Sequence, residues 1–137
     1  MPALLIAEDN GAVAEALRRK AESCGWSVTL CPDGAELLAA LPALPAPALL
    51  LIDVNMPRLN GIEAIERVAD APLPEPTRIR FMTGGADVNA AAARMIAEAK
   101  GLDVGETLYK PFPMSLFADM LASEATRFRE MDRPDGA

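Results

Sequence analysis

Histidine is absent from this chain of 137 residues, and cysteine occurs only twice. The lack of histidine excludes Ser-His-Asp and Cys-His catalysis and removes the commonest general base. Any chemistry must therefore use carboxylates, lysine, hydroxyl groups or a metal. Cys24 and Cys31 both have apolar neighbours, so we expect two buried free thiols rather than a disulfide or a zinc site.

Basic residues are also few, since 13 Lys and Arg stand against 20 Asp and Glu and the formal net charge is −7. A protein that binds nucleic acid needs clustered basic groups to displace counterions, so we expect no nucleic-acid partner. No apolar run approaches the ~20 residues of a membrane span, and the N-terminus lacks the pattern of a signal peptide. These features predict a cytoplasmic protein that does not contact a membrane.

Aromatic residues make up only 4% of the chain, but hydrophobic residues in total reach 51%. This composition suffices for one ordinary domain whose core is mainly aliphatic. We expect the domain to cover residues 1–131 and residues 132–137 to form a frayed C-terminal tail.

Short apolar segments alternate with amphipathic ones along the whole chain. We expect strands at 3–7, 26–31, 48–54, 78–82 and 107–109, and helices from Asn10 to Gly25, after Asp33, and at 61–71, 87–100 and 114–130. Proline-rich stretches after residues 41 and 71 are expected to be stiff connectors. Strict alternation predicts an α/β fold, a flavodoxin-like (βα)5 doubly wound parallel sheet of strand order 2-1-3-4-5.

Reactive side chains stand where the expected central strands end: Glu8 and Asp9, Asp53, Thr83 and Lys110. In open α/β sheets, ligands bind at this edge. Exposed strand ends collect polar residues in any case, which explains each of them singly but poorly explains all of them together. Crowded carboxylates repel one another and either raise a pKa or bind a cation such as Mg²⁺. A carboxylate beside Mg²⁺ and a lysine can attack phosphorus.

Four motifs at these strand ends resemble those of the receiver domain of two-component response regulators. They are Ile-Ala-Glu-Asp-Asn at residues 6–10, Leu-Ile-Asp-Val-Asn-Met-Pro at 51–57 with Gly61, Phe-Met-Thr-Gly at 81–84, and Lys-Pro-Phe at 110–112. Each motif alone is weak, but the four in this order are specific. The resemblance extends from Leu4 to about Arg129.

The resemblance implies a role for each residue that matches a motif. Asp53 matches the residue that accepts a phosphoryl group. Asp9 matches a direct ligand of Mg²⁺, and Glu8 matches its acidic partner, which often acts through water. The backbone carbonyl of Asn55 matches a further metal ligand.

At the other two strand ends, Thr83 and Lys110 match the residues that contact the phosphoryl group, and the bond from Lys110 to Pro111 would be cis. One position departs from the family: three residues before the lysine, an aromatic residue usually swings inward, and here that position is Thr107. Tyr109 directly precedes Lys110, so strand alternation should point it to the opposite face. The resemblance therefore implies an atypical receiver. The longer stretch between Thr83 and Lys110, which holds an alanine-rich helix, is a second departure.

By resemblance, the chain takes a phosphoryl group from a partner phosphohistidine, in a histidine kinase or a histidine phosphotransfer protein, and passes a conformational signal to a protein partner. It is then a signalling phosphoprotein that catalyses only its own phosphorylation and dephosphorylation, and we expect a monomer or weak dimer. The moving parts are expected to be the Gly84-Gly85 loop and the alanine-rich helix. The expected partner surface is this helix, the fifth strand and the last helix.

Two other functions remain open. A haloacid-dehalogenase-type phosphatase also uses an aspartate after a strand, but it needs a second acid two residues later, where this chain has Asn55. A pseudo-receiver would keep the fold as a protein-binding module without phosphorylation, and it ranks lower because all five matched side chains are present. The sequence also leaves open a stand-alone receiver, a phosphorelay intermediate or a piece of a longer protein.

Overall fold

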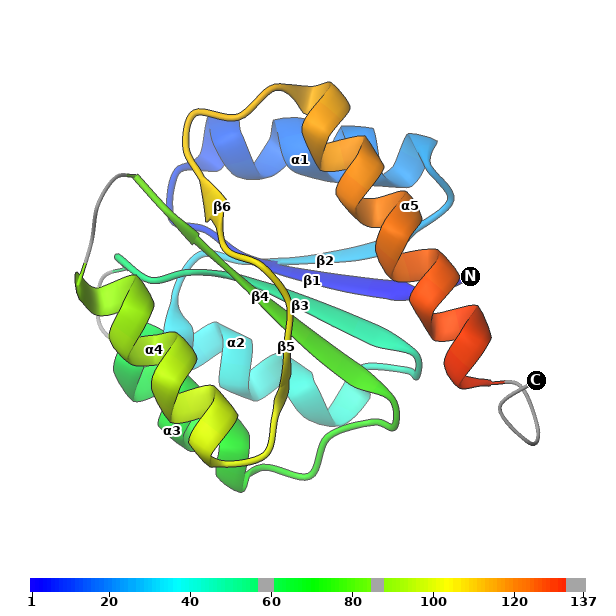
Figure 1. Cartoon of the computed structure of the whole chain (residues 1–137). Helices are drawn as coiled ribbons and strands as arrows, with labels where there is room; N and C mark the ends of the chain where they lie inside the picture. The colour runs from blue at the N-terminus through cyan, green and yellow to red at the C-terminus, as the bar shows by residue number, and fades with distance from the viewer. Residues whose placement is uncertain (57–60, 85–87, 133–137) are drawn as a thin grey trace.

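A parallel β-sheet runs through the centre of the molecule (Figure 1). The computed structural model describes residues 1–56, 61–84 and 88–132. The strands are β1 (Ala3–Ala7), β2 (Ser27–Cys31), β3 (Ala48–Asp53), β4 (Thr77–Thr83), β5 (Asp103–Val104) and β6 (Leu108–Tyr109). Their order is β2-β1-β3-β4-β5, and β6 also pairs with β4. This arrangement confirms the predicted flavodoxin-like strand order.

Helices cover both faces of the sheet (Figure 1). They are α1 (Gly11–Ser23), α2 (Gly34–Ala40) with the short 3₁₀ turn η1 (Leu41–Ala43), α3 (Gly61–Asp70), α4 (Val88–Ala99) and α5 (Met114–Met131). Helices α1 and α5 lie on one face, and α2, α3 and α4 lie on the other. No helix in the described part of the chain is long and apolar enough to cross a membrane.

The burial of each strand follows from this layering. Every residue of β1 and β3 is buried, because these central strands are covered on both faces. The edge strand β2 instead alternates between exposed and half-buried residues up to Cys31. Alternate residues of β3 therefore enter two separate cores: Leu50 packs on the α2–α4 side, and Leu49 packs on the α1–α5 side.

Local capping sets several of the helix boundaries that the sequence predicts. The Asn10 side chain accepts a hydrogen bond from the Val13 amide at 3.1 Å, and this begins α1. Asp33 does the same for the Glu36 amide at 2.9 Å. Gly25 follows α1 with a φ of 90°, a conformation that favours glycine.

Three sequence predictions need correction. The last strand is not one segment at 107–109 but two short ones, and β5 was missed because two residues carry no periodicity. Pro42 begins a stretch that was expected to be a stiff connector, but it lies in the 3₁₀ turn η1, because the first turn of a helix tolerates proline. Cys24 is exposed, so only Cys31 is buried as expected, and both thiols are free.

Some predictions fall outside the described residues. They are the motif residue Pro57, the loop residue Gly85, the helix start at Asp87 and the tail from 133 to 137.

Candidate functional site

Three carboxylates meet at the carboxyl ends of two neighbouring strands. Glu8 and Asp9 follow β1, and Asp53 is the last residue of β3, which pairs with β1 in parallel. One carboxylate oxygen from each lies within 4.8 Å of the others. Glu8 and Asp53 are buried, with 3% and 4% of their surface exposed, but Asp9 is exposed. The cluster is thus anchored in the sheet and open to solvent on one side.

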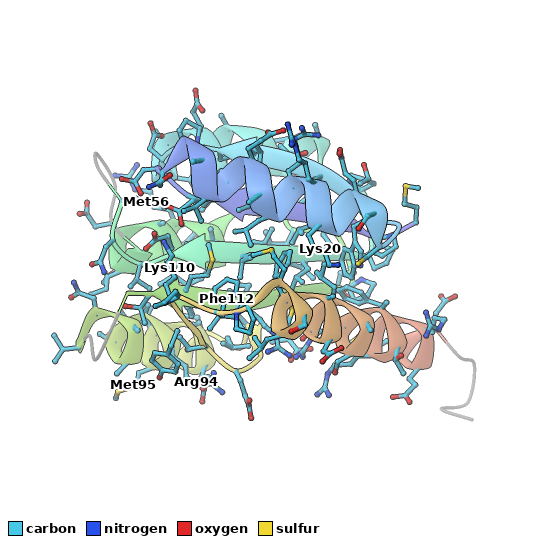
Figure 2. The ribbon with its side chains drawn as sticks, turned by 90° about the horizontal axis from the view of Figure 1, so that it is seen from above. Lys20, Met56, Arg94, Met95, Lys110 and Phe112 are labelled. Atoms are coloured by element: carbon cyan, nitrogen blue, oxygen red, sulfur yellow. The ribbon has the colours of Figure 1, made fainter. Side chains whose placement is uncertain are left out.

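Lys110 joins this cluster from the segment that follows β6. Its Nζ donates a hydrogen bond to Asp53 Oδ2 at 2.7 Å and a second one to Glu8 Oε1. The residue lies at the same end of the molecule as Met56, which follows β3 (Figure 2). One ammonium therefore bridges two buried carboxylates, and the bond to Pro111 is cis, as the resemblance implied.

The electrostatics of the site leave it short of positive charge. Burial raises the pKa of the Glu8 carboxyl, and the nearby charge of Asp53 adds to this rise, although the hydrogen bonds from Lys110 and the Asn10 amide oppose it. Burial alone would lower the pKa of Lys110, but its bonds to Asp53 and Glu8 outweigh this and raise it. Lys110 is therefore charged at neutral pH, and among the residues that the structure describes it is the one cation bonded to these carboxylates.

Backbone amides orient the two buried carboxylates. The amide of Asn55 donates to Asp53 Oδ1 at 2.9 Å, and the amide of Asn10 donates to Glu8 Oε2 at 3.0 Å. Each donor stands two residues after the acid, the spacing of an Asx-type turn. These amide donors were not predicted from the sequence, although the acid-x-Asn spacing at both strand ends signals them.

Thr83 is placed beside the cluster by the register of β4. Its neighbour Met82 pairs with Asp53, and Thr83 itself is fully buried. The Thr83 carbonyl accepts a hydrogen bond from the Lys110 amide at 2.8 Å. The strand ends predicted to be reactive thus come together at the carboxyl end of the sheet, and Tyr109 is 60% exposed.

The donor set suits a hard divalent cation. Mg²⁺ prefers oxygen ligands and keeps several waters, and carboxylates from Glu8, Asp9 and Asp53 are close enough to share one ion. The exposed side of the cluster at Asp9 gives such an ion a path from solvent. The backbone amide of Asn55 donates a hydrogen bond to Asp53. The role of the Asn55 carbonyl as a metal ligand stays a prediction.

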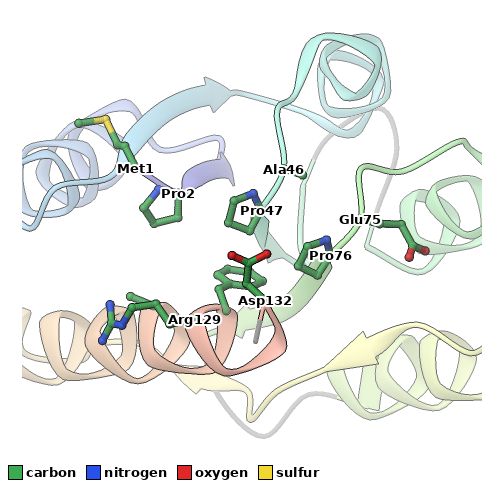
Figure 3. A pocket seen from close by; sticks show the side chains of 10 residues that line it. Met1, Pro2, Ala46, Pro47, Glu75, Pro76, Arg129 and Asp132 are labelled. Atoms are coloured by element: carbon green, nitrogen blue, oxygen red, sulfur yellow. The ribbon is translucent and has the colours of Figure 1, made fainter. Parts of the chain in front are cut away.

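A hollow of about 420 Å³ lies at the opposite end of the sheet, where the parallel strands begin (Figure 3). Pro2, Pro47 and Pro76, which precede β1, β3 and β4, face the last turns of α5 at Phe128 and Arg129 across it. Because ligands of open α/β sheets bind at the carboxyl ends of the strands, this hollow is separate from the acidic site.

Comparison with known proteins identifies the class to which this fold and site belong. The family described as "Response regulator receiver domain" matches residues 4–122, and the chain belongs to this family. It is 34% identical over 134 residues to the response regulator MprA of Mycolicibacterium vanbaalenii, covering 98% of this chain and 53% of that protein. The chain therefore spans about half the length of the curated relatives it matches.

Solved structures share the fold. A response regulator from Colwellia psychrerythraea superposes with a TM-score of 0.76 at 23% identity, over 92% of this chain and 98% of that one. The receiver domain of a sensor histidine kinase from Pseudomonas aeruginosa, described with a magnesium ion coordinated in its active-site cleft, has a TM-score of 0.70 at 22% identity, over 88% of this chain and 94% of that one.

Proposed function

We propose that this receiver domain takes a phosphoryl group from a partner phosphohistidine onto Asp53, and that the resulting change of shape is a signal to another protein. The observation that carries the proposal is the position of Asp53. Its buried carboxylate lies 2.7 Å from Lys110 Nζ and shares one edge of the sheet with Glu8 and Asp9. These 137 residues contain no histidine, so a phosphohistidine donor lies outside them.

The transfer is a displacement at phosphorus. An Asp53 carboxylate oxygen forms the new P–O bond, the P–N bond to the donor imidazole breaks, and the electron pair of that bond stays on the leaving imidazole. The Asn55 amide and Lys110 hold the attacking carboxylate in place. The Lys110 ammonium donates hydrogen bonds to both Glu8 and Asp53. It can therefore turn one of these donors to the phosphoryl oxygens once they carry the negative charge.

We assign Mg²⁺ as the cofactor, with Asp9 and Asp53 as ligands, Glu8 as their acidic partner and the Asn55 carbonyl completing the set. When bound, the ion offsets charge between the carboxylates and the incoming phosphoryl group. The clustering of three carboxylates, two of which pair with Lys110, supports this assignment. The magnesium described for the Pseudomonas aeruginosa receiver domain supports it by analogy.

The signal is proposed to start at Thr83 and Lys110. A phosphoryl group adds about −1.5 to −2 charges and three acceptor oxygens. The Thr83 hydroxyl would donate to one of them, and Gly84 can adopt new backbone angles at low steric cost. The movement would then pass to the start of α4.

The partners follow from this chemistry. The donor is a histidine kinase or a histidine phosphotransfer protein, and the target is a further protein. We propose a cytoplasmic signalling unit of residues 1–131, monomeric or weakly dimeric, which catalyses only its own phosphorylation and dephosphorylation. It acts as a stand-alone receiver, as a phosphorelay intermediate or as part of a longer protein.

The partner surface is proposed to lie over α4, the two short strands β5 and β6, and α5. Large apolar side chains are exposed on each: Met95 at 72%, Tyr109 at 60% and Leu116 at 44% (Figure 2 labels Met95). Helix α5 carries an apolar stripe of five large residues, Leu116, Phe117, Met120, Leu121 and Phe128, and the last four are buried in the core. Of that stripe, only Leu116 remains for a partner.

Phosphorylation by acetyl phosphate, followed by intact-protein mass measurement, tests the function. Wild-type protein should gain one phosphoryl group only when Mg²⁺ is present. Asp53→Asn should gain none, because the amide is not a nucleophile, whereas Asp70→Asn at the exposed end of α3 should behave as wild type. Uptake at the wild-type rate by Asp53→Asn would refute the assignment. A wild type that takes up nothing would favour the pseudo-receiver, and turnover of small phosphate esters would favour the phosphatase.

A further inference from the structure

A buried ionic cluster connects β4 to α5, away from the carboxylates of the acidic site. Glu124 of α5 has 1% of its side chain exposed and accepts from two arginines of β4. Arg78 Nε lies 2.5 Å from Glu124 Oε2, its Nη2 lies 3.1 Å from Oε1, and Arg80 Nε lies 2.9 Å from Oε1. Burying these charges costs free energy that an apolar contact would not, so stability alone does not account for the cluster.

The same arginines hold a segment that we call the strap, residues 103–110. Arg78 Nη1 donates to the Asp103 carboxylate, and Arg80 Nη1 donates to the Glu106 carbonyl at 3.2 Å. From the other side, Arg94 of α4 donates to the Gly105 carbonyl, and Figure 2 shows Arg94 on that helix. The strap is thus tied to β4, to α4 and, through Arg80, to α5.

The far end of the strap lies in the acidic site. The Lys110 amide donates to the Thr83 carbonyl at 2.8 Å, and the Lys110 ammonium bonds Asp53. Only residues 107–109 separate Lys110 from Glu106, whose carbonyl bonds Arg80. Two of them, Leu108 and Tyr109, pair with β4 as β6. A displacement of Lys110 is therefore passed along one short extended segment to the Arg80 guanidinium. This guanidinium also donates a hydrogen bond to Glu124.

We propose that the Arg78–Arg80–Glu124 cluster is the coupling element through which the state of Asp53 reaches α5. This inference rests on the proposed phosphoacceptor function. The guanidinium of Arg80 is a planar fork with fixed donor directions, so a movement of the Glu106 carbonyl works against its bond to Glu124. In this proposal, a shift of the strap exchanges one set of hydrogen bonds for another, and the cluster acts as a two-state contact. Glu124 and Arg80 are positioning residues, since neither touches the reacting atoms.

Amide hydrogen exchange with Mg²⁺, in the presence and absence of beryllofluoride as a phosphoryl mimic, tests this coupling in the whole chain. In wild type, we expect beryllofluoride to change the amide exchange rate by about fivefold or more. The change should appear at residues 108–110, in the rest of the strap and across the middle of α5. In Glu124→Gln, the change near residues 108–110 should remain and the change in α5 should be lost. Glu130→Gln, at an exposed position of the same helix, is the matched control and should respond as wild type.

Gly105→Ala tests the coupling without removing a charge. A Cβ at Gly105 would lie 2.8 Å from Arg80 Nε and 3.0 Å from Arg78 Nη2, so it would push both guanidinium groups from their places. At Gly11, an added Cβ meets nothing within 4 Å, which makes Gly11→Ala the matched control. We expect Gly105→Ala to bind beryllofluoride as wild type does and to lose the response of α5.

The outcomes separate the two proposals. No change anywhere in wild type would overturn the phosphoacceptor assignment and the coupling with it. A wild-type response near residues 108–110 without one in α5 would overturn the coupling alone. A full α5 response in folded Gly105→Ala would also overturn it, even if Glu124→Gln fails to fold. Loss of the α5 response in Gly105→Ala, with the local response kept, would establish it.

Discussion

Replacing Asp9 with alanine should remove the stabilisation of this protein by Mg²⁺. A ligand that binds only the native state raises the free energy of unfolding by RT ln(1 + [L]/Kd), which is about 2.7 kcal/mol at 100 times Kd. Asp9 is the exposed member of the carboxylate cluster, and the buried Glu8 and Asp53 already share Lys110. Its loss should weaken Mg²⁺ binding strongly and leave the fold intact.

Without Mg²⁺, the same substitution should raise the free energy of unfolding instead of lowering it. Two unit charges 4.8 Å apart, the outer limit for this cluster, repel by about 3.5 kcal/mol at an effective dielectric of ~20 and by about 0.9 kcal/mol in water. Asp9 is exposed, so the lower figure applies, and Lys110 offsets part of it. We therefore expect Asp9→Ala to be more stable than wild type without Mg²⁺, by less than about 0.9 kcal/mol.

Thermal and urea unfolding with EDTA or with saturating Mg²⁺ would measure both effects. Asp70→Ala is the control, because it removes an exposed carboxylate at the end of α3. It should keep the full Mg²⁺ shift of wild type. Equal Mg²⁺ shifts in wild type and Asp9→Ala would show that Asp9 is not a ligand. A loss of stability in Asp9→Ala without Mg²⁺ would show that repulsion does not dominate at this residue.

Two further predictions concern other parts of the fold. Burial raises the pKa of Cys31 from 9.0 to about 11, so at pH 8 iodoacetamide should modify Cys31 at least ~100-fold more slowly than the ordinary thiolate fraction would allow. In single-cysteine variants, Cys24, which is exposed, should react readily, and equal rates would contradict the burial of Cys31. Helix α4 should have the fastest amide exchange of the described helices in the unphosphorylated protein, because its fully buried side chains are all alanines and bury little apolar surface. Protection in α4 as strong as in α5, which buries Phe117 and Leu121, would contradict this.

Most of the fold could be predicted from the sequence, because its determinants are local. The uninterrupted apolar run that became β3 indicates a strand covered on both faces, and Asn10 and Asp33 cap the helices that follow them. The same locality reached the site, since the carboxyl ends of parallel strands meet at one edge. Glu8, Asp9, Asp53 and Lys110 could thus be grouped before their distances were known.

Only the tertiary structure decided contacts between residues far apart in the chain. Arg78 and Glu124 are separated by 46 positions, and nothing in a charged residue on a strand or in a helix says that it will be buried against the other. The exposure of Cys24 and the split of the last strand into β5 and β6 were also beyond the sequence, because apolar neighbours do not determine which side of a helix end faces water, and two-residue strands have no period. Local pattern thus determined the elements and the edge at which they present reactive groups, and three-dimensional packing decided which charges are buried together and how the strap ties that edge to α5.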